Sequence, residues 1–197
     1  MRARPPVKAI VFVAAALPLV VLTGRLLSGT LGANPADTLI DRTGEWSLRL
    51  LLITLAITPL RRLTGWRWPG RVRRMLGLFT FFYGVLHFAA YAVLEQSLRP
   101  VAMAGDVIER PFIAVGFAAL LGLLPLALTS TRGAMMRLGT WWARLHRSVY
   151  LWAVLSVLHF YLLVKADIRE PAIYALILGG LLGFRLLPWR WQRGLRA

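Results

Sequence analysis

The sequence of 197 residues contains no cysteine. Its absence excludes disulfide bonds, iron–sulfur clusters held by thiolates, Cys-x-x-Cys redox pairs and the Cys-x-x-Cys-His attachment of c-type haem. If the protein transfers electrons, it therefore does so through a bound cofactor whose ligands are not cysteine.

Carboxylates are scarce as well, since 8 Asp and Glu stand against 24 Lys and Arg and give a formal net charge of +16. In a soluble protein this balance would suggest a nucleic-acid partner. Here the basic residues lie in short connections between apolar stretches, and such connections offer no known module for reading nucleic acid. We therefore expect no nucleic-acid partner and interpret the charge as a signal of membrane topology and of lipid-headgroup contact.

Long polar stretches are missing too, because 58% of the residues are hydrophobic and the mean hydropathy is +0.63. Soluble domains are about 45–50% apolar. A helix that crosses the bilayer core needs roughly 20 apolar residues. The sequence thus predicts an all-α integral membrane protein, a single six-helix bundle over residues 1–197, with spans at 8–28, 44–60, 75–95, 111–128, 147–166 and 171–188.

The orientation of the bundle follows from alternating charge. Basic residues gather at the N-terminal segment, in the second and fourth connections and at the C-terminal end. Because positive residues favour the cytoplasmic side, we expect both termini in the cytoplasm. The acidic residues all fall in or beside the other three connections, on the expected outer side: Asp37, Asp41, Glu45, Glu95, Asp106, Glu109, Asp167 and Glu170.

The chain has three histidines, and two of them lie within predicted spans. His87 and His159 each lie about 12 residues from the cytoplasmic start of their span, which is roughly 18 Å along a helix. We therefore expect both rings at the same depth, in the outer half of the membrane. Two imidazoles at one level of a helical bundle are typical of the axial ligands of b-type haem.

Other roles for this pair stay open at the level of the residues alone. A histidine inside a membrane often forms hydrogen bonds between helices, and it can also carry protons. A zinc site would need further ligands, which the two histidines do not supply. A proton relay would lack carboxylates, because every acidic residue lies near the outer side.

Three further residues are candidate cofactor contacts. His146 lies at the cytoplasmic boundary, where we expect either a ligand of a second haem or a contact to a headgroup, a quinone or a flavin phosphate. Arg25 and Arg49 lie near the outer ends of their helices. Each is expected either to pair with a haem propionate or to extend to the outer headgroups.

Nearly the whole chain resembles a known family. The resemblance is carried by GANPADTLIDRTGEWSLRLLLITLAITPLRR, RRMLGLFTFFYGVLHFAAYAVLEQ, RPFIAVGFAALLGLLPLALTS and RLGTWWARLHRSVYLWAVLSVLHFYLLVKADIREP. These segments are similar to the haem-binding subunit of the bacterial protein-methionine-sulfoxide reductase system (the MsrQ/YedZ family), which is related to the transmembrane domain of ferric reductases and NADPH oxidases.

The resemblance implies a multi-pass protein of the bacterial inner membrane that holds haem b, one or two groups, and also FMN. It implies that electrons come from the membrane quinone pool and pass to a periplasmic molybdopterin-containing catalytic subunit, which reduces methionine sulfoxide in oxidised proteins. His87, His146 and His159 match haem-linked histidines of the family. One histidine of the usual four is absent, which leaves the second haem open, and the flavin–NADPH domain of the larger oxidases is missing.

We therefore expect an electron-transfer subunit that leaves the reduction of methionine sulfoxide to its partner. Two competing hypotheses remain at this stage. One is a proton or ion transporter that uses the histidines as a relay, and the other is a metalloreductase that acts alone on external iron.

Overall fold

The computed structural model describes residues 5–164 and 167–187, and every regular element in these ranges is a helix. The elements are α1 (Pro5–Leu27), α2 (Pro35–Thr64), α3 (Pro69–Ala90), the π-helix η1 (Tyr91–Glu95), α4 (Pro100–Glu109), α5 (Pro111–Leu128), α6 (Arg132–Leu138), α7 (Thr140–Arg147), α8 (Val149–Leu163) and α9 (Arg169–Leu186). The prediction of an all-α protein is confirmed.

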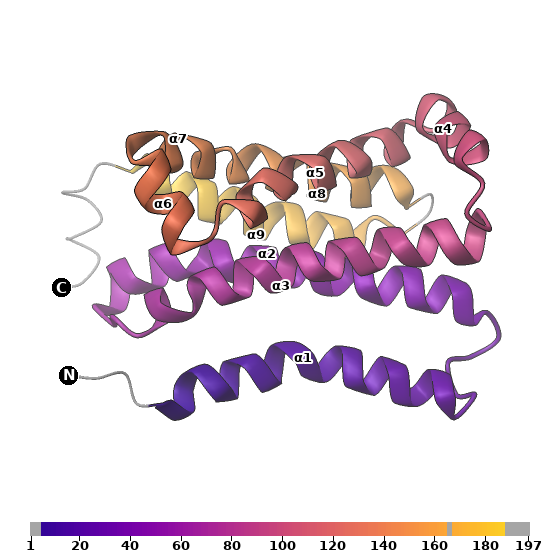
Figure 1. Ribbon diagram of the computed structural model, residues 1–197, viewed down its shortest axis with the longest axis horizontal. Helices are drawn as coiled ribbons and strands as arrows, with labels where there is room; N and C mark the ends of the chain where they lie inside the picture. The colour runs from indigo at the N-terminus through magenta and orange to yellow at the C-terminus, as the bar shows by residue number, and fades with distance from the viewer. Residues whose placement is uncertain (1–4, 165–166, 188–197) are drawn as a thin grey trace.

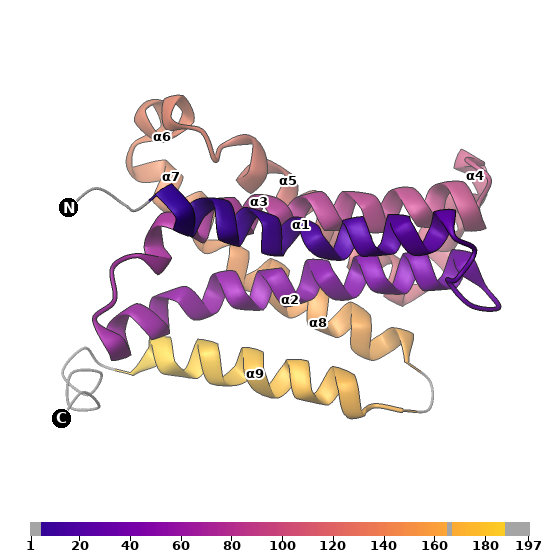
Figure 2. The ribbon, with the colours of Figure 1, turned by 90° about the horizontal axis from the view of Figure 1, so that it is seen from below.

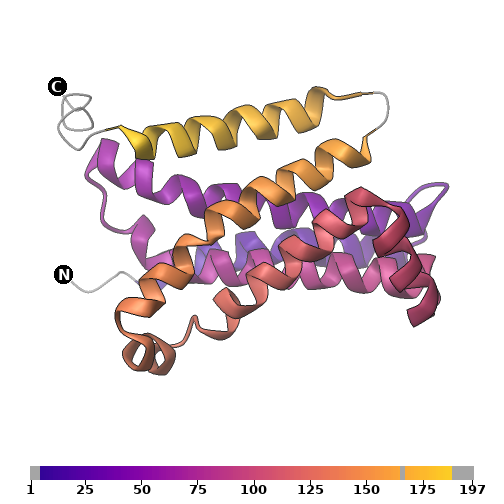
Figure 3. The ribbon, with the colours of Figure 1, turned by 90° about the horizontal axis from the view of Figure 1, so that it is seen from above.

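Six long helices lie side by side and alternate in direction: α1, α2, α3, α5, α8 and α9 (Figures 1 and 2). Helix α4 lies at one end of the bundle, and α6 and α7 lie at the other (Figure 3). We refer to these as the α4 end and the α7 end. Helix α1 begins and α9 ends at the α7 end, which the basic residues predict to be cytoplasmic.

Three stretches of the described chain are long and apolar enough to cross a membrane: Pro6–Leu27, Pro69–Glu95 and Pro111–Leu128. They coincide with the first, third and fourth predicted spans. The remaining three spans and the orientation stay predictions, and residues 165, 166 and 188 of the last two spans lie outside the described residues.

Helix α3 begins six residues before its predicted span, and α2 and α8 also differ in extent from the apolar runs that predicted them. Helix α2 is longer because the Asn34 side chain accepts a hydrogen bond from the Asp37 N–H at its start, and Gly65 ends it in the left-handed conformation, at φ 74°. The expected span 147–166 contains α8, which begins only at Val149, since Ser148 separates it from α7.

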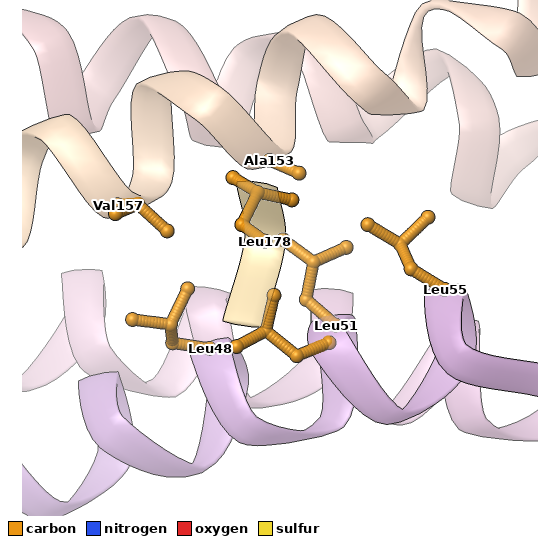
Figure 4. Packing of buried hydrophobic residues seen from close by; sticks show 7 residues of the cluster. Leu48, Leu51, Leu55, Ala153, Val157 and Leu178 are labelled. Carbon is orange, nitrogen blue, oxygen red and sulfur yellow. The ribbon is translucent and has the colours of Figure 1, made fainter. Parts of the chain in front are cut away.

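Helix α2 is the centre of the bundle because opposite faces of it are buried. On one face Leu48, Leu51 and Leu55 pack against Ala153 and Val157 of α8 and against α9 (Figure 4). This spacing of three, four and seven residues is that of one helical face. On the other face, another set of apolar side chains packs with α1 and α3: Ala15, Leu50, Ile57, Val72, Leu76 and Tyr83.

Helix α1 is joined to α3 through a hydroxyl group. The Tyr83 hydroxyl accepts from the Leu19 N–H at 3.1 Å and donates to the Ala15 carbonyl at 2.9 Å. It thereby contacts both the N–H and the carbonyl that pair with each other in a regular helix, next to Pro18, which has no N–H of its own. Tyr83 is almost fully buried, so water does not compete for the hydrogen bonds that its hydroxyl forms between the two helices.

We expect Tyr83→Phe to lower the free energy of unfolding in detergent by about 1–2 kcal/mol, because hydrogen bonds between membrane helices contribute at most about that much. Thermal unfolding followed by circular dichroism would measure the change. Tyr161→Phe is the matched control, since Tyr161 is exposed on α8. Equal losses in the two variants would contradict a special role for the Tyr83 hydroxyl.

Candidate functional site

His87 on α3 and His159 on α8 face one another, which agrees with the equal depth that the sequence predicts for them. Their ring centroids are 6.1 Å apart and the ring planes meet at 74°. The two helices are parallel and are brought to this distance by their packing against α2 and α5. Residues 72 positions apart in the chain thus meet inside the bundle.

Each histidine is oriented by a main-chain carbonyl of a neighbouring helix. Nδ1 of His87 lies 2.8 Å from the Ile40 carbonyl of α2, and Nδ1 of His159 lies 2.6 Å from the Phe112 carbonyl of α5. A carbonyl only accepts, so Nδ1 carries the hydrogen in both rings. The lone pair of each ring is then at Nε2, which is the arrangement seen in metal-binding histidines.

A glycine makes room for each ring. Gly44 and Gly116 follow the accepting carbonyls by one helical turn. A Cβ at Gly44 would lie 2.9 Å from Nδ1 of His87, and a Cβ at Gly116 would lie 2.6 Å from Nδ1 of His159. Helices α2 and α5 therefore each offer a carbonyl together with a gap into which an imidazole fits.

The two halves of the site are built alike. His87 and Ile40 are separated by 47 residues, and so are His159 and Phe112. In each of the helix pairs α2–α3 and α5–α8, the first helix thus supplies a carbonyl and a glycine, and the second supplies the histidine that they contact. Sequence reasoning missed both glycines and both carbonyls, although the recurrence of a glycine at a fixed distance before each histidine is visible in the sequence.

The distance between the rings fits a metal held by two axial imidazoles. A metal–imidazole bond is about 2 Å long and the ring centre lies about 1 Å beyond the nitrogen, so two such rings have centres about 6 Å apart. Among the described residues, no cluster of three or more His, Cys, Asp or Glu side chains is placed to hold a metal ion. The donor set therefore suits haem iron better than zinc.

His146 lies on α7, at the other end of the bundle from α4, so it is not part of this pair. Its ring stacks on Trp142 with centroids 3.9 Å apart, and its Nδ1 lies 3.1 Å from the Trp142 carbonyl. Nε2 is buried and has no hydrogen-bond partner in the described chain. Burial is the main cause that lowers the pKa of His146, and the charge of Arg73 adds to it, while the Trp142 and Leu126 carbonyls act in the opposite direction.

The two candidate arginines are engaged with nearby residues. Arg25 donates to the Thr30 carbonyl in the connection that follows α1, at 2.9 Å from Nη2. Arg49 donates to Glu45 and to the Tyr174 hydroxyl, each at 2.9 Å. A propionate contact by either arginine stays a prediction.

Comparison with known proteins finds relatives over most of the chain. The family model described as "Ferric reductase like transmembrane component" matches residues 43–157. A protein-methionine-sulfoxide reductase heme-binding subunit MsrQ of Rhodospirillum rubrum is 54% identical over 90% of the chain and 86% of its own length. A protein of the same name from Bordetella pertussis is 47% identical over 98% of the chain and 95% of its own length. Another, from Xanthomonas axonopodis pv. citri, is 55% identical over 81% of the chain and 73% of its own length. No solved structure matches the chain.

We expect Gly116→Ala and Gly44→Ala to reduce haem retention on purification, and Gly116→Ala to do so more, because its Cβ would approach the histidine ring more closely. The histidine ring would move more easily than the helix backbone, and it would then no longer face the other histidine. Haem per polypeptide, measured by the pyridine haemochrome absorbance, would report the loss. Gly180→Ala on α9 is the control, since nothing lies within 4 Å of a Cβ there; full retention in all three variants would contradict the role of the two glycines.

Proposed function

The chain belongs to the family of haem-binding subunits of protein-methionine-sulfoxide reductases, the MsrQ proteins, and on this premise we propose that it carries electrons across the membrane through haem b held by His87 and His159. The observation that supports the proposal most is the pair itself. Two imidazoles face each other with ring centroids 6.1 Å apart, and each is oriented by a carbonyl at Nδ1 so that Nε2 is left for a metal.

The bound haem would supply one-electron transfer, and the protein supplies its position and surroundings. His87 and His159 would be the axial ligands. Ile40 and Phe112 fix the rings through their carbonyls, which raises the basicity of the nitrogens that bind the metal.

The direction of transfer in this proposal is outward. The α4 end is outer by the distribution of basic residues, and His87 lies near that end, in the last turn of α3. Electrons would come from the quinone pool of the bacterial inner membrane and pass to a periplasmic molybdopterin-containing subunit that reduces methionine sulfoxide. FMN belongs to the same proposal, with His146 as a ligand of a second haem or as a contact to another cofactor, and the protein itself would have no activity on methionine sulfoxide.

A transporter with a histidine relay fits the site less well, because both Nδ1 atoms are committed to main-chain carbonyls. A metalloreductase that acts alone would use the same haem site. It is distinguished by its acceptor, which would be external ferric iron.

We expect His87→Ala or His159→Ala to remove most of the low-spin haem, because either change deletes one of two axial ligands. His146→Ala is the control histidine and should leave a substantial part. The dithionite-reduced visible spectrum of each purified protein would show the α-band of b-type haem. Loss of all haem in His146→Ala, with none lost in His87→Ala, would show that the pairing is wrong.

We also expect quinol to reduce the haem in membranes, and a periplasmic catalytic partner together with methionine sulfoxide to reoxidise it. Stopped-flow absorbance at the α-band would follow both steps. Ferric citrate added without the partner serves as the second acceptor. Rapid reoxidation by ferric citrate, together with none by the partner, would favour the metalloreductase.

A further inference from the structure

Arg185 is anchored to a carbonyl that a proline leaves free. The side chain comes from the last turn of α9, and its Nη2 donates to the Leu55 carbonyl of α2 at 2.7 Å. In a regular helix that carbonyl would accept from the N–H of residue 59, but residue 59 is a proline and has none. The position of Pro59 in α2 therefore sets the place of the Arg185 guanidinium.

The rest of this guanidinium is not satisfied by the described chain. Nε and Nη1 of Arg185 are buried and have no hydrogen-bond partner there. The Tyr150 ring of α8 covers the group, with Cζ 4.7 Å from the ring centroid. A ring face attracts a cation but accepts no conventional hydrogen bond from these N–H groups. Two donors are thus left without an acceptor, and because Nε and Nη1 lie on different edges of the guanidinium, each needs an acceptor atom of its own.

The surroundings of Arg185 are positive. The charges of Arg73 and Arg62 both act on it, and Nη1 of Arg73 donates to the Thr58 hydroxyl of α2 at 3.3 Å, one turn from Leu55. The chain offers no carboxylate side chain to balance them, because all eight acidic residues lie in or beside the predicted outer connections. A buried positive charge requires a partner of opposite charge.

We propose that Arg185, together with Arg73, binds the phosphate group of a ligand at the α7 end of the bundle. A phosphate supplies negative charge and several acceptor oxygens at once, and the hydrogen bonds between an arginine and a phosphate are strengthened by their opposite charges. A neutral carbonyl ligand would satisfy the donors but leave the charges unbalanced. The α7 end is the predicted cytoplasmic boundary, where a flavin mononucleotide and an anionic lipid are the two sources of phosphate. The proposal does not depend on haem at His87 and His159.

The test compares the wild-type protein with Arg185→Gln and Arg73→Gln in detergent, with Arg132→Gln as the control. Arg132 is an exposed arginine of α6 at the same end of the bundle. FMN and riboflavin, which differ by the phosphate alone, are titrated by the quenching of flavin fluorescence. Phosphatidylglycerol and phosphatidylcholine are compared by their retention in native mass spectrometry. Melting temperatures show which variants are folded.

If the phosphate is that of a flavin, Arg185→Gln weakens FMN binding by about tenfold or more, as the loss of charged hydrogen bonds would do, and leaves riboflavin binding unchanged. If it is that of a lipid, the variant loses its preference for phosphatidylglycerol. Arg73→Gln gives a smaller loss of the same kind and serves as the test if Arg185→Gln does not fold. Unchanged binding in both arms, an equal loss for FMN and riboflavin, or an equal loss in Arg132→Gln would overturn the proposal.

Discussion

Several side-chain donors inside this bundle bond to main-chain carbonyls of neighbouring helices, and the arrangement of the helices depends on these bonds. His87 donates to Ile40, His159 to Phe112 and Arg185 to Leu55. The chain has few carboxylates, and those lie toward the predicted outer end of the bundle. The acceptors available in the apolar interior are therefore main-chain carbonyls. Because a carbonyl is fixed by its helix, each such bond also fixes one helix against another.

Helix α2 takes the largest part in this scheme. It presents the Ile40 carbonyl and Gly44 to one histidine, the Leu55 carbonyl to Arg185, and apolar faces on opposite sides. The second histidine needs a similar surface, and α5 supplies it with Phe112 and Gly116. The site is thus assembled from two like halves, each a helix with a gap and a carbonyl and a second helix with a histidine.

The sequence predicted the helical class and the facing histidines because both depend on simple lengths. Apolar runs set where helices lie, and equal distances from the predicted cytoplasmic side set the depth of His87 and His159. It did not predict what each histidine contacts, because a carbonyl acceptor depends on the rotation of a neighbouring helix, which hydropathy does not encode. Nor did apolar runs show that capping by Asn34 lengthens α2, or that Ser148 divides α7 from α8, since these depend on local polar groups.

The hydroxyl bridge between α3 and α1 has a consequence for biogenesis. Leu19 leaves the ribosome 64 residues before Tyr83, so the first helix reaches the translocon well before the hydroxyl that joins it exists. Until then the Leu19 N–H and the Ala15 carbonyl have each other as helical partners, beside a proline that already weakens the turn. The final course of α1 is therefore set during synthesis only when the third helix arrives, so the first helix to be inserted is not completed on its own.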